Sequence, residues 1–321
     1  MGAPDAGRED TRIPLVAVVG PTGTGKSELA IALARELDGE VVNADALQLY
    51  RGMDVGTAKL PPAQRHGVPH HQLDVLVVRE EATVAAYQTA ARADLEAVRA
   101  RGRVPVVVGG SGLYVRALLD RMEIPPTDPG VRARWEAELE RVGAEALHAR
   151  LAEVDPVAAR AIQPRNGRRV VRALEVVELT GRPFSATMPA REHVRPTVVL
   201  GLRADREVLD ARIGRRAEAM WRAGLVEEVR GLVERGLREG RTASRAVGYA
   251  QALRQLDGEL TQEEAVADTV GATRRLARRQ ERWFGPDPRV VWLEHDAPDL
   301  LDQALAAVAA GPVSPGSPAG P

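Results

Sequence analysis

Short runs of β-branched and other apolar residues alternate along this chain with longer segments in which apolar residues recur every three or four positions. The short runs predict strands and the amphipathic segments predict helices. The predicted strands cover residues 15–19, 40–43, 104–108, 197–202 and 289–293. Strands separated by helical segments are typical of a parallel sheet flanked by helices, so the sequence predicts an α/β fold.

The pattern changes between residues 121 and 195, where only helical segments separated by prolines are predicted. We therefore expect an α/β core made of residues 13–120 and 196–310, with an inserted all-helical subdomain at 121–195. Residues 1–12 are polar, and residues 311–321 contain mainly proline, glycine and serine. Such compositions bury little apolar surface, so we expect a loose N-terminal tail and a disordered C-terminal tail.

A glycine-rich run follows the first predicted strand directly and precedes a helical pattern. It reads Gly20, Pro21, Thr22, Gly23, Thr24, Gly25, Lys26 and Ser27, which matches the phosphate-binding P-loop pattern GxxxxGK[ST]. In that loop consecutive backbone N–H groups surround a phosphate and the helix N-terminus adds partial positive charge. Lys26 supplies a mobile cation, and the Ser27 hydroxyl can bind magnesium. The sequence therefore predicts a P-loop core that holds a phosphorylated ligand.

The rest of the chain must indicate which molecule carries the phosphate. The strand at 104–108 runs into Gly109-Gly110-Ser111-Gly112, where a generic ATPase would carry an aspartate. The strand at 40–43 leads to Asp45, which places a carboxylate near the edge of the sheet where ligands bind. Two interpretations of Asp45 remain: a catalytic group, or the N-cap of a helix that begins with ALQLY.

Composition excludes several classes of protein and site. The chain has no cysteine, which excludes disulfides and thiolate metal sites, and its net charge of −1 gives no overall signal for a polyanion partner. Lysine occurs only at Lys26 and Lys59 among 44 basic residues. No apolar run is long enough to span a bilayer, and the N-terminus resembles no signal peptide. We therefore expect a cytoplasmic protein with no membrane association.

Six blocks of sequence resemble, in order and spacing, the bacterial tRNA dimethylallyltransferase family: GPTGTGKS, NADALQLYRGMDVGTAK, PHHQLD, GGSGLYVRALL, GRRVVRALEVVELTGR and RAVGY. The resemblance covers roughly residues 14 to 290. It implies transfer of a dimethylallyl group from dimethylallyl diphosphate to the N6 amine of adenosine 37, beside the tRNA anticodon. It also implies Mg2+ as cofactor, tRNA as macromolecular partner, a flipped-out adenine, and no hydrolysis of a triphosphate. We expect a monomer.

The resemblance also implies roles for individual residues. The catalytic group comprises Asp45 as general base, Thr22 near the bridging oxygen and Arg216, or its neighbour Arg215, on the diphosphate. The diphosphate lies on the P-loop from Gly20 to Ser27, with magnesium on Ser27. Contacts with tRNA are implied for Asp45, Ala46, Leu47, Gln48, Ser111, Arg132, Arg169, Arg172, Arg245, Gly248 and Tyr249.

The chain departs from the family pattern at three places. The P-loop reads TGTGKS where TASGKT is expected, Ser111 replaces a threonine, and Ala250 stands where many members carry an arginine. The first two changes preserve the required groups, whereas Ala250 removes one possible phosphate contact. His70 and His71 have no third ligand at metal-site spacing, so we interpret them as structural loop residues.

Two other functions fit parts of the sequence. A small-molecule P-loop kinase would explain the bare phosphate-loop motif but not the GGSGLY segment or the helical insertion. A non-catalytic tRNA-binding protein would explain the arginine clusters but not Asp45 or the P-loop. In a chain this rich in arginine, clusters on helices also arise as ordinary solvated faces.

Overall fold

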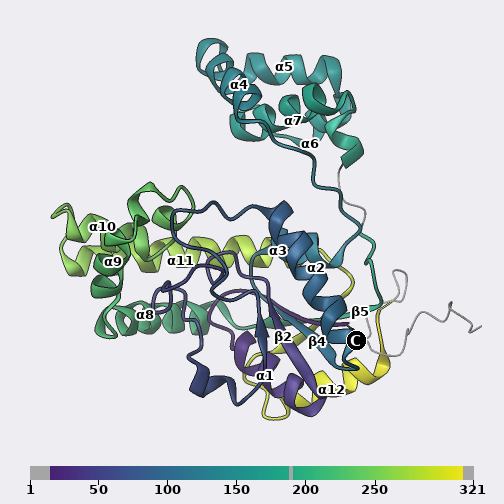
Figure 1. Cartoon of the computed structure of the whole chain (residues 1–321), viewed down its shortest axis with the longest axis vertical. Coiled ribbons are helices and arrows are strands. Elements are labelled where there is room, and N and C mark those ends of the chain that lie inside the picture. The colour runs from purple at the N-terminus through teal and green to yellow at the C-terminus, as the bar shows by residue number, and fades with distance from the viewer. Residues whose placement is uncertain (1–14, 188–190, 314–321) are drawn as a thin grey trace, which may run out of the picture. The chain divides into compact units, whose positions relative to one another are not determined.

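The predicted strands lie in one six-stranded sheet, in the order β3-β2-β4-β1-β5-β6 (Figure 1). The computed structural model describes residues 15–187 and 191–313. The strands are β1 (Leu15–Val19), β2 (Gly39–Asn43), β3 (His70–His71), β4 (Val104–Val108), β5 (Thr197–Arg203) and β6 (Val290–Glu294). All neighbours pair in parallel. Each predicted strand is therefore confirmed, with ends that differ by at most one residue.

Strand β3 was not predicted, and the interpretation of His70 and His71 as loop residues was wrong. The two histidines pair with Val41 and Val42 at the edge of the sheet. His71 Nε2 also lies 2.6 Å from a carboxylate oxygen of the buried Glu40. A strand of two polar residues shows no alternation of side chains, so no sequence period could reveal it.

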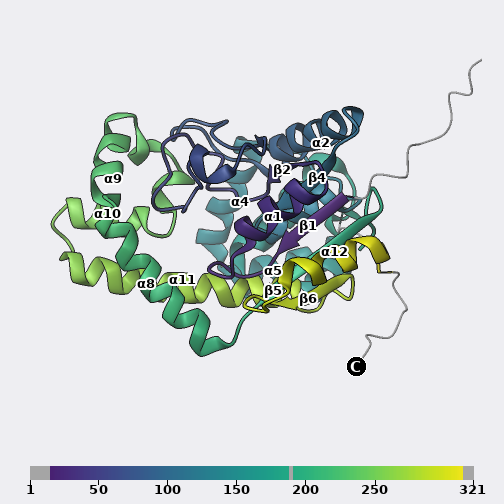
Figure 2. The same ribbon diagram turned by 90° about the horizontal axis from the view of Figure 1, so that it is seen from below.

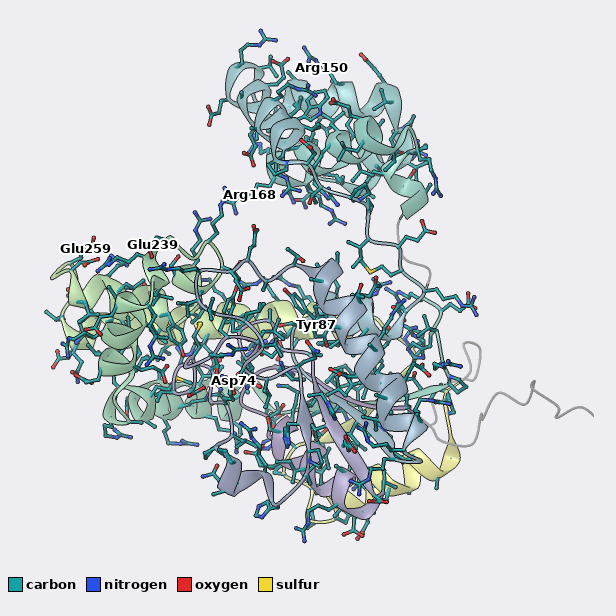
Figure 3. The ribbon with its side chains drawn as sticks, viewed as in Figure 1. Asp74, Tyr87, Arg150, Arg168, Glu239 and Glu259 are labelled. Carbon is teal, nitrogen blue, oxygen red and sulfur yellow. The ribbon has the colours of Figure 1, made fainter. Side chains whose placement is uncertain are left out.

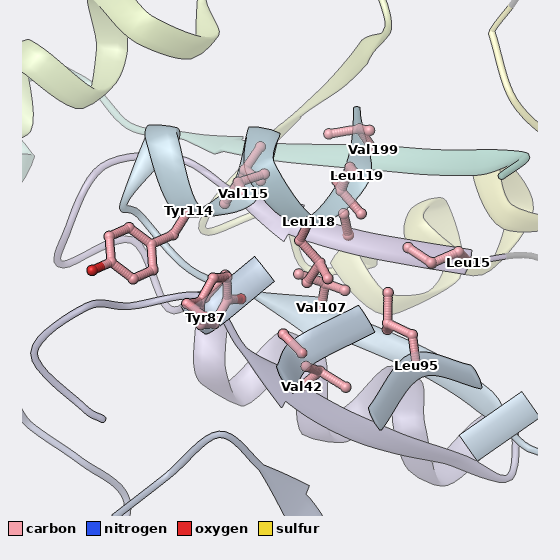
Figure 4. Close-up of a cluster of buried hydrophobic side chains, with 14 of the residues drawn as sticks. Leu15, Val42, Tyr87, Leu95, Val107, Tyr114, Val115, Leu118, Leu119 and Val199 are labelled. Carbon is pink, nitrogen blue, oxygen red and sulfur yellow. The ribbon is translucent and has the colours of Figure 1, made fainter. Parts of the chain in front are cut away.

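The sheet is buried on both faces because alternate side chains of each strand point to opposite sides. On one face Leu15, Ala17 and Val19 of β1 join a cluster with helices α2 (Val84–Ala100) and α3 (Gly112–Leu119) (Figure 4). On the other face Val16 and Val18 pack with helices α1 (Lys26–Glu36) and α12 (Leu300–Ala310). Continuous apolar strands are what a sheet covered on both faces requires.

Further helices follow β5 along the chain. They are α8 (Arg206–Arg222), α9 (Leu225–Glu234), α10 (Tyr249–Leu256) and α11 (Gln262–Phe284). Helices α8 and α11 run side by side, as Figures 1 and 2 both show. Helices α9 and α10 pack together and bury Tyr50 and Met53 from the loop after β2. No helix in the described ranges is long and apolar enough to cross a membrane.

The described residues group into two compact units. One comprises the residues up to Leu119 and from Arg195 onward, and Asp120–Val194 forms the other. The second unit contains α4 (Pro129–Val142), α5 (Ala144–Val154), α6 (Pro156–Ala161) and α7 (Gly167–Thr180), which share an apolar core that includes Leu147, Leu151 and Leu174. The predicted N-terminal tail at 1–12 lies outside the described residues, as do residues 314–321 of the C-terminal tail predicted at 311–321.

Candidate active site around the phosphate loop

The loop between β1 and α1 takes its shape from glycine. Gly23 and Gly25 have φ values of 90° and 86°, in the left-handed region that side chains disfavour. Gly20 has a φ of 130°, and a Cβ atom there would lie only 2.4 Å from the carbonyl oxygen of Leu202. The chain can therefore turn sharply against β5 and begin α1 at Lys26, with the first amides of the helix turned toward the loop.

Side chains of the loop also bond to its own backbone. The Thr24 hydroxyl and the Lys26 ammonium group both donate to the carbonyl oxygen of Pro21, at 2.9 and 2.7 Å. Arg212 of α8 donates from Nε to the carbonyl oxygen of Gly23 at 2.7 Å. The loop is therefore held in its curled form from inside and from α8.

A glutamine of α11 connects the phosphate loop to the segment after β4. Gln280 is buried, its Oε1 accepts from the Thr22 amide at 2.8 Å, and its Nε2 donates to the carbonyl oxygen of Gly110 at 3.0 Å. One side-chain amide thus fixes the distance between the phosphate loop and the backbone that leads to Ser111.

A cavity of about 410 Å³ lies against the phosphate loop. Its lining residues come from the loop, from the end of β2, from the segment before residue 61 and from α8. They are Thr22, Gly23, Gly25, Lys26, Ser27, Glu28, Asp45, Ala58, Leu60, Arg212, Arg215 and Arg216. Four cations and two carboxylates therefore face one space, which suits an anionic ligand whose reacting end meets a carboxylate.

The basic groups at this cavity affect one another's ionisation. Burial, followed by the positive charge of Arg216, lowers the pKa of Lys26 to about 8, while the carboxylates of Asp45 and Glu28 act in the opposite direction. Burial also lowers the pKa of Arg216, which Asp45 and Glu28 again oppose. Because like charges are crowded into a poorly hydrated space, an incoming anion is attracted strongly.

Asp45 lies just beyond β2 at the end of the sheet where open α/β folds bind ligands. Its amide donates to Asn43 Oδ1 at 3.0 Å, and its Oδ1 accepts from the Leu47 amide at 2.9 Å. Residues 46–49 form turns, so the helix expected for ALQLY is absent and the N-cap interpretation was wrong. Asp45 instead shapes a tight turn by the side-chain-to-backbone bond that aspartate commonly makes.

The turn after Asp45 also contacts the segment after β4. The Ala46 amide donates to Ser111 Oγ at 3.3 Å, and Ala44 bonds to Val108 at the ends of the paired strands. A Cβ at Gly109 would lie 2.4 Å from the carbonyl oxygen of Ala44, so only glycine allows this close approach. Asp45 and Ser111, both predicted site residues, are thus brought together.

The second lysine of the chain has a structural task. Lys59 is buried, and its ammonium group donates to Asp54 at 2.7 Å, to Asp74 at 2.6 Å and to the carbonyl oxygen of Tyr50 at 2.8 Å. Three oxygen acceptors match the three donors of an ammonium group. Lys59 therefore closes the long loop that contributes Ala58 and Leu60 to the cavity.

Two of the arginines expected at tRNA converge on one buried carboxylate in the helical unit. Glu175 of α7 has no solvent-exposed side-chain surface, and it pairs with Arg132 at 2.7 Å and with Arg172 at 2.8 Å. Arg172 also donates to the carbonyl oxygens of Pro125 and Pro126. By contrast Arg169 is exposed, as is the neighbouring Arg168 on the surface of this unit (Figure 3).

The residues of the RAVGY segment differ from one another in exposure. Arg245 is exposed, Gly248 is buried with a φ of 90°, and Tyr249 is fully buried. The Tyr249 hydroxyl donates to Glu228 of α9 at 2.6 Å. Burial, together with the charge of Glu228, raises the pKa of Tyr249. The fully buried ring offers no face to a base in this structure, and the tRNA contact implied for Tyr249 stays a prediction.

Sequence reasoning missed Gln280, Arg212 and Glu228. Each bonds to a residue far away along the chain: Gln280 and Thr22 are 258 positions apart, and Arg212 and Gly23 are 189 apart. An isolated glutamine or arginine in a helix carries no motif, so no sequence signal marked them. Arg215 and Arg216 were both candidates for the diphosphate contact. Arg215 is exposed while Arg216 is half-buried, which favours Arg216.

Comparison with known proteins gives one consistent result. The model of the IPP transferase family matches residues 48–287. The chain is 64% identical to the tRNA dimethylallyltransferase of Kocuria rhizophila, over 95% of this chain and 97% of that protein. It is 61% identical to the Thermobifida fusca enzyme of the same name, over 92% and 94%.

Solved structures agree with these relatives. The tRNA isopentenylpyrophosphate transferase of Bacillus halodurans is 38% identical, with a TM-score of 0.68 over 92% of this chain and 96% of that one. A eukaryotic dimethylallyltransferase solved while acting on tRNA is 27% identical, with a TM-score of 0.77 over 92% and 77%. The phosphate-loop fold, the family match and the high identity together identify the chain as a member of the IPP transferase family, the family of tRNA dimethylallyltransferases.

Proposed function

We propose that this chain transfers the dimethylallyl group of dimethylallyl diphosphate to the N6 amine of adenosine 37 in tRNA and releases diphosphate. The observation that carries the proposal is the position of Asp45, whose carboxylate lines the same cavity as the phosphate loop. A phosphate site alone would suit many enzymes. A carboxylate beside it adds the proton acceptor that an attacking amine needs.

In the proposed reaction the amine nitrogen forms a bond to the allylic carbon while the bond from that carbon to the diphosphate oxygen breaks. The diphosphate leaves with the electron pair, and the proton of the amine passes to Asp45. The turn bond from Leu47 to Oδ1 fixes the orientation of the carboxylate. A carboxylate held in place before the reaction needs little reorganisation as the nitrogen becomes positive.

The departing diphosphate is assigned to the phosphate loop with Lys26, Arg216 and the side chain of Thr22. Their positive charges and donors act where negative charge develops, which is the usual way an enzyme assists a leaving group. Because Arg216 is the more buried of the two adjacent arginines, we assign it rather than Arg215 to this contact.

Magnesium fits the donors at this cavity. Ser27, Glu28 and Asp45 present hydroxyl and carboxylate oxygens, the ligand type that Mg2+ prefers, and magnesium commonly uses one or two protein oxygens together with phosphate oxygens. We assign the Ser27 hydroxyl as its protein ligand. When bound with the diphosphate, the ion would neutralise charge on the leaving group.

We assign the contacts with the adenine to Asp45–Gln48 and Ser111. The contacts with the tRNA phosphates are assigned to exposed basic residues. Extrusion of the adenine from its stack gives the amine access to the cavity. Arg169 on α7 and Arg245 of the RAVGY segment are exposed, so both are available to phosphates. We assign Arg132 and Arg172 to the support of α7, because Glu175 already pairs with both. We further propose that the enzyme acts as a monomer in the cytoplasm.

Mass spectrometry of tRNA incubated with the protein, dimethylallyl diphosphate and magnesium tests the proposal. We expect the mass increase of one dimethylallyl group, confined to the anticodon-loop fragment. Unmodified tRNA together with phosphoryl transfer from ATP would instead establish the kinase. Tight tRNA binding without any adduct would establish a non-catalytic binding protein.

A further inference from the structure

One wall of the cavity is the loop of residues 54–60, here called the pocket wall. Its Ala58 and Leu60 face the cavity. The carbonyl oxygen of Thr57 accepts from Arg216 Nη2 at 3.4 Å and from Gln48 Nε2 at 3.2 Å. One backbone oxygen thus holds both the arginine assigned to the diphosphate and a residue assigned to the adenine.

The pocket wall is held from outside by α9 and α10. Glu228 Oε2 accepts from the Asp54 and Val55 amides at 3.1 and 2.8 Å, and its Oε1 accepts from the Tyr249 hydroxyl at 2.6 Å. The Tyr249 ring lies so close to Gly56 that a Cβ there would be 2.4 Å from the ring. The backbone of the loop at residues 54–56 is therefore held by one tyrosine–glutamate pair.

We propose that Tyr249 and Glu228 are positioning residues for the transfer reaction, which set the pocket wall so that Arg216 points toward the diphosphate. This inference rests on the proposed function. It assigns the tyrosine of RAVGY to the diphosphate side of the site instead of to the tRNA.

Three observations favour this role over a general contribution to stability. Glu228 has its two oxygens directed to three donors, of which two belong to the pocket wall. Gly56 leaves room for the ring, so the loop and Tyr249 fit each other closely. Lys59 ties the same loop to Tyr50 and to the side chain of Asp54, whereas the amides of Asp54 and Val55 bond to Glu228. The Tyr249 hydroxyl belongs to a buried side chain, and removing the hydrogen-bond partner of such a group is costly.

The test measures two affinities separately. Binding of inorganic diphosphate with magnesium is followed by calorimetry, and tRNA binding by filter retention, for Tyr249→Phe, Glu228→Ala and Glu228→Gln. We expect Tyr249→Phe and Glu228→Ala to weaken diphosphate binding by about tenfold, the effect of losing one buried bond to a charged group, while tRNA affinity stays within about twofold. The KM for dimethylallyl diphosphate should rise, whereas the KM for tRNA should not.

We expect Glu228→Gln to bind diphosphate more tightly than Glu228→Ala, because the glutamine amide still offers one acceptor to the loop and one donor to Tyr249. The control is Glu227→Ala, the exposed neighbour on α9 that contacts Arg230 at 3.6 Å. It should match the unaltered protein in both affinities. In the double variant Tyr249→Phe/Glu228→Ala, the loss should be smaller than the product of the two single losses, since both act through one pair.

Several results would overturn the inference: a fall in tRNA affinity with unchanged diphosphate binding, independent effects in the double variant, or variants that behave like Glu227→Ala. A variant that melts earlier yet binds diphosphate normally also contradicts it. Failure of the unaltered protein to bind diphosphate would instead refute the proposed function, so the two failures are distinguished.

Discussion

Asp45 carries both a structural and a proposed chemical task, because a carboxylate has two oxygens. Oδ1 accepts the Leu47 amide and shapes the turn after β2. We assign the proton of the substrate amine to the same carboxylate. Asparagine keeps the shape and one acceptor oxygen, so substitution separates the two tasks.

We predict that Asp45→Asn lowers the single-turnover rate of prenyl transfer by about 10² to 10⁴-fold, the usual contribution of a general base. Affinities for tRNA and dimethylallyl diphosphate should change little, because the turn survives. Rapid-quench measurements with labelled donor give the rate, and thermal melting confirms the fold. Full activity of this variant would falsify the assignment of Asp45 as base.

The lowered pKa of Lys26 predicts a pH dependence of diphosphate binding. Below pH 8 the ammonium group of the ligand-free protein is charged, and it loses this charge as the pH rises through about 8. Because the bound anion favours the charged form, the dissociation constant should change little near pH 7, begin to rise as the pH approaches 8 and rise more steeply above it.

Calorimetry with dimethylallyl diphosphate at several pH values measures this effect, and binding near pH 8 should take up a proton. Lys26→Arg provides the comparison, since its guanidinium stays charged throughout. A rise of equal size in the arginine variant would assign the pH dependence to another group.

Helix α7 carries arginines that differ in exposure and in bonding. Arg169 is exposed on the helix, whereas Arg172 lies three positions further on and clamps Glu175 and the carbonyl oxygens of Pro125 and Pro126. An exposed arginine can exchange its hydration for a phosphate contact, but a clamped one would have to leave its partners.

We predict that Arg169→Ala weakens tRNA binding and lowers the slope of log affinity against log salt by about one unit, without changing the melting temperature. Arg172→Ala should instead destabilise the helical unit by about 3 kcal/mol, because it leaves Glu175 with one ion-pair partner fewer in a buried position. Filter binding over a salt series and thermal melting separate the two outcomes. Equal salt slopes for the unaltered protein and Arg169→Ala would assign Arg169 to the solvated surface.

Considered as a whole, the molecule has a net charge of −1 and consists of two compact units, of which only one contains the phosphate loop. Association with tRNA must therefore depend on local groups of arginines. The proposed diphosphate site lies within the α/β unit, because every residue that lines its cavity belongs to that unit.

We therefore predict that diphosphate with magnesium protects the α/β unit from hydrogen exchange and leaves the helical unit unchanged. At a ligand concentration about 100 times the dissociation constant, the stabilisation should be about 2.7 kcal/mol. Exchange measured by mass spectrometry on peptides from α1, α8 and α7 tests this. Equal added protection in α7 would show that the ligand couples the two units.

Much of the fold follows from local pattern. The apolar runs of β1, β4 and β5 and the glycines of the phosphate loop restrict the backbone over a few residues, so their structures could be read in order along the chain. Strand β3 could not, since two histidines become a strand only because β2 offers them an edge.

Some residues of the candidate site could likewise be predicted from local sequence, and others could not. Lys26 and Asp45 sit beside strand ends that the sequence marks, and the resemblance to a family pointed to Arg216. The burial of Tyr249 and the pairing of Arg172 with Glu175 could not be foreseen, because exposure depends on which elements cover a residue.

By itself the sequence determined the parallel α/β core, the phosphate loop and the position of a carboxylate at the edge of the sheet. These depend on short-range rules: strand alternation, helix periodicity and the freedom of glycine. Only the tertiary structure decided that Gln280 bonds to Thr22 from 258 positions away, and that Glu228 holds Asp54 from 174 positions away. A hydrogen bond needs two atoms within about 3 Å, and for such distant residues the packing of whole helices decides that distance.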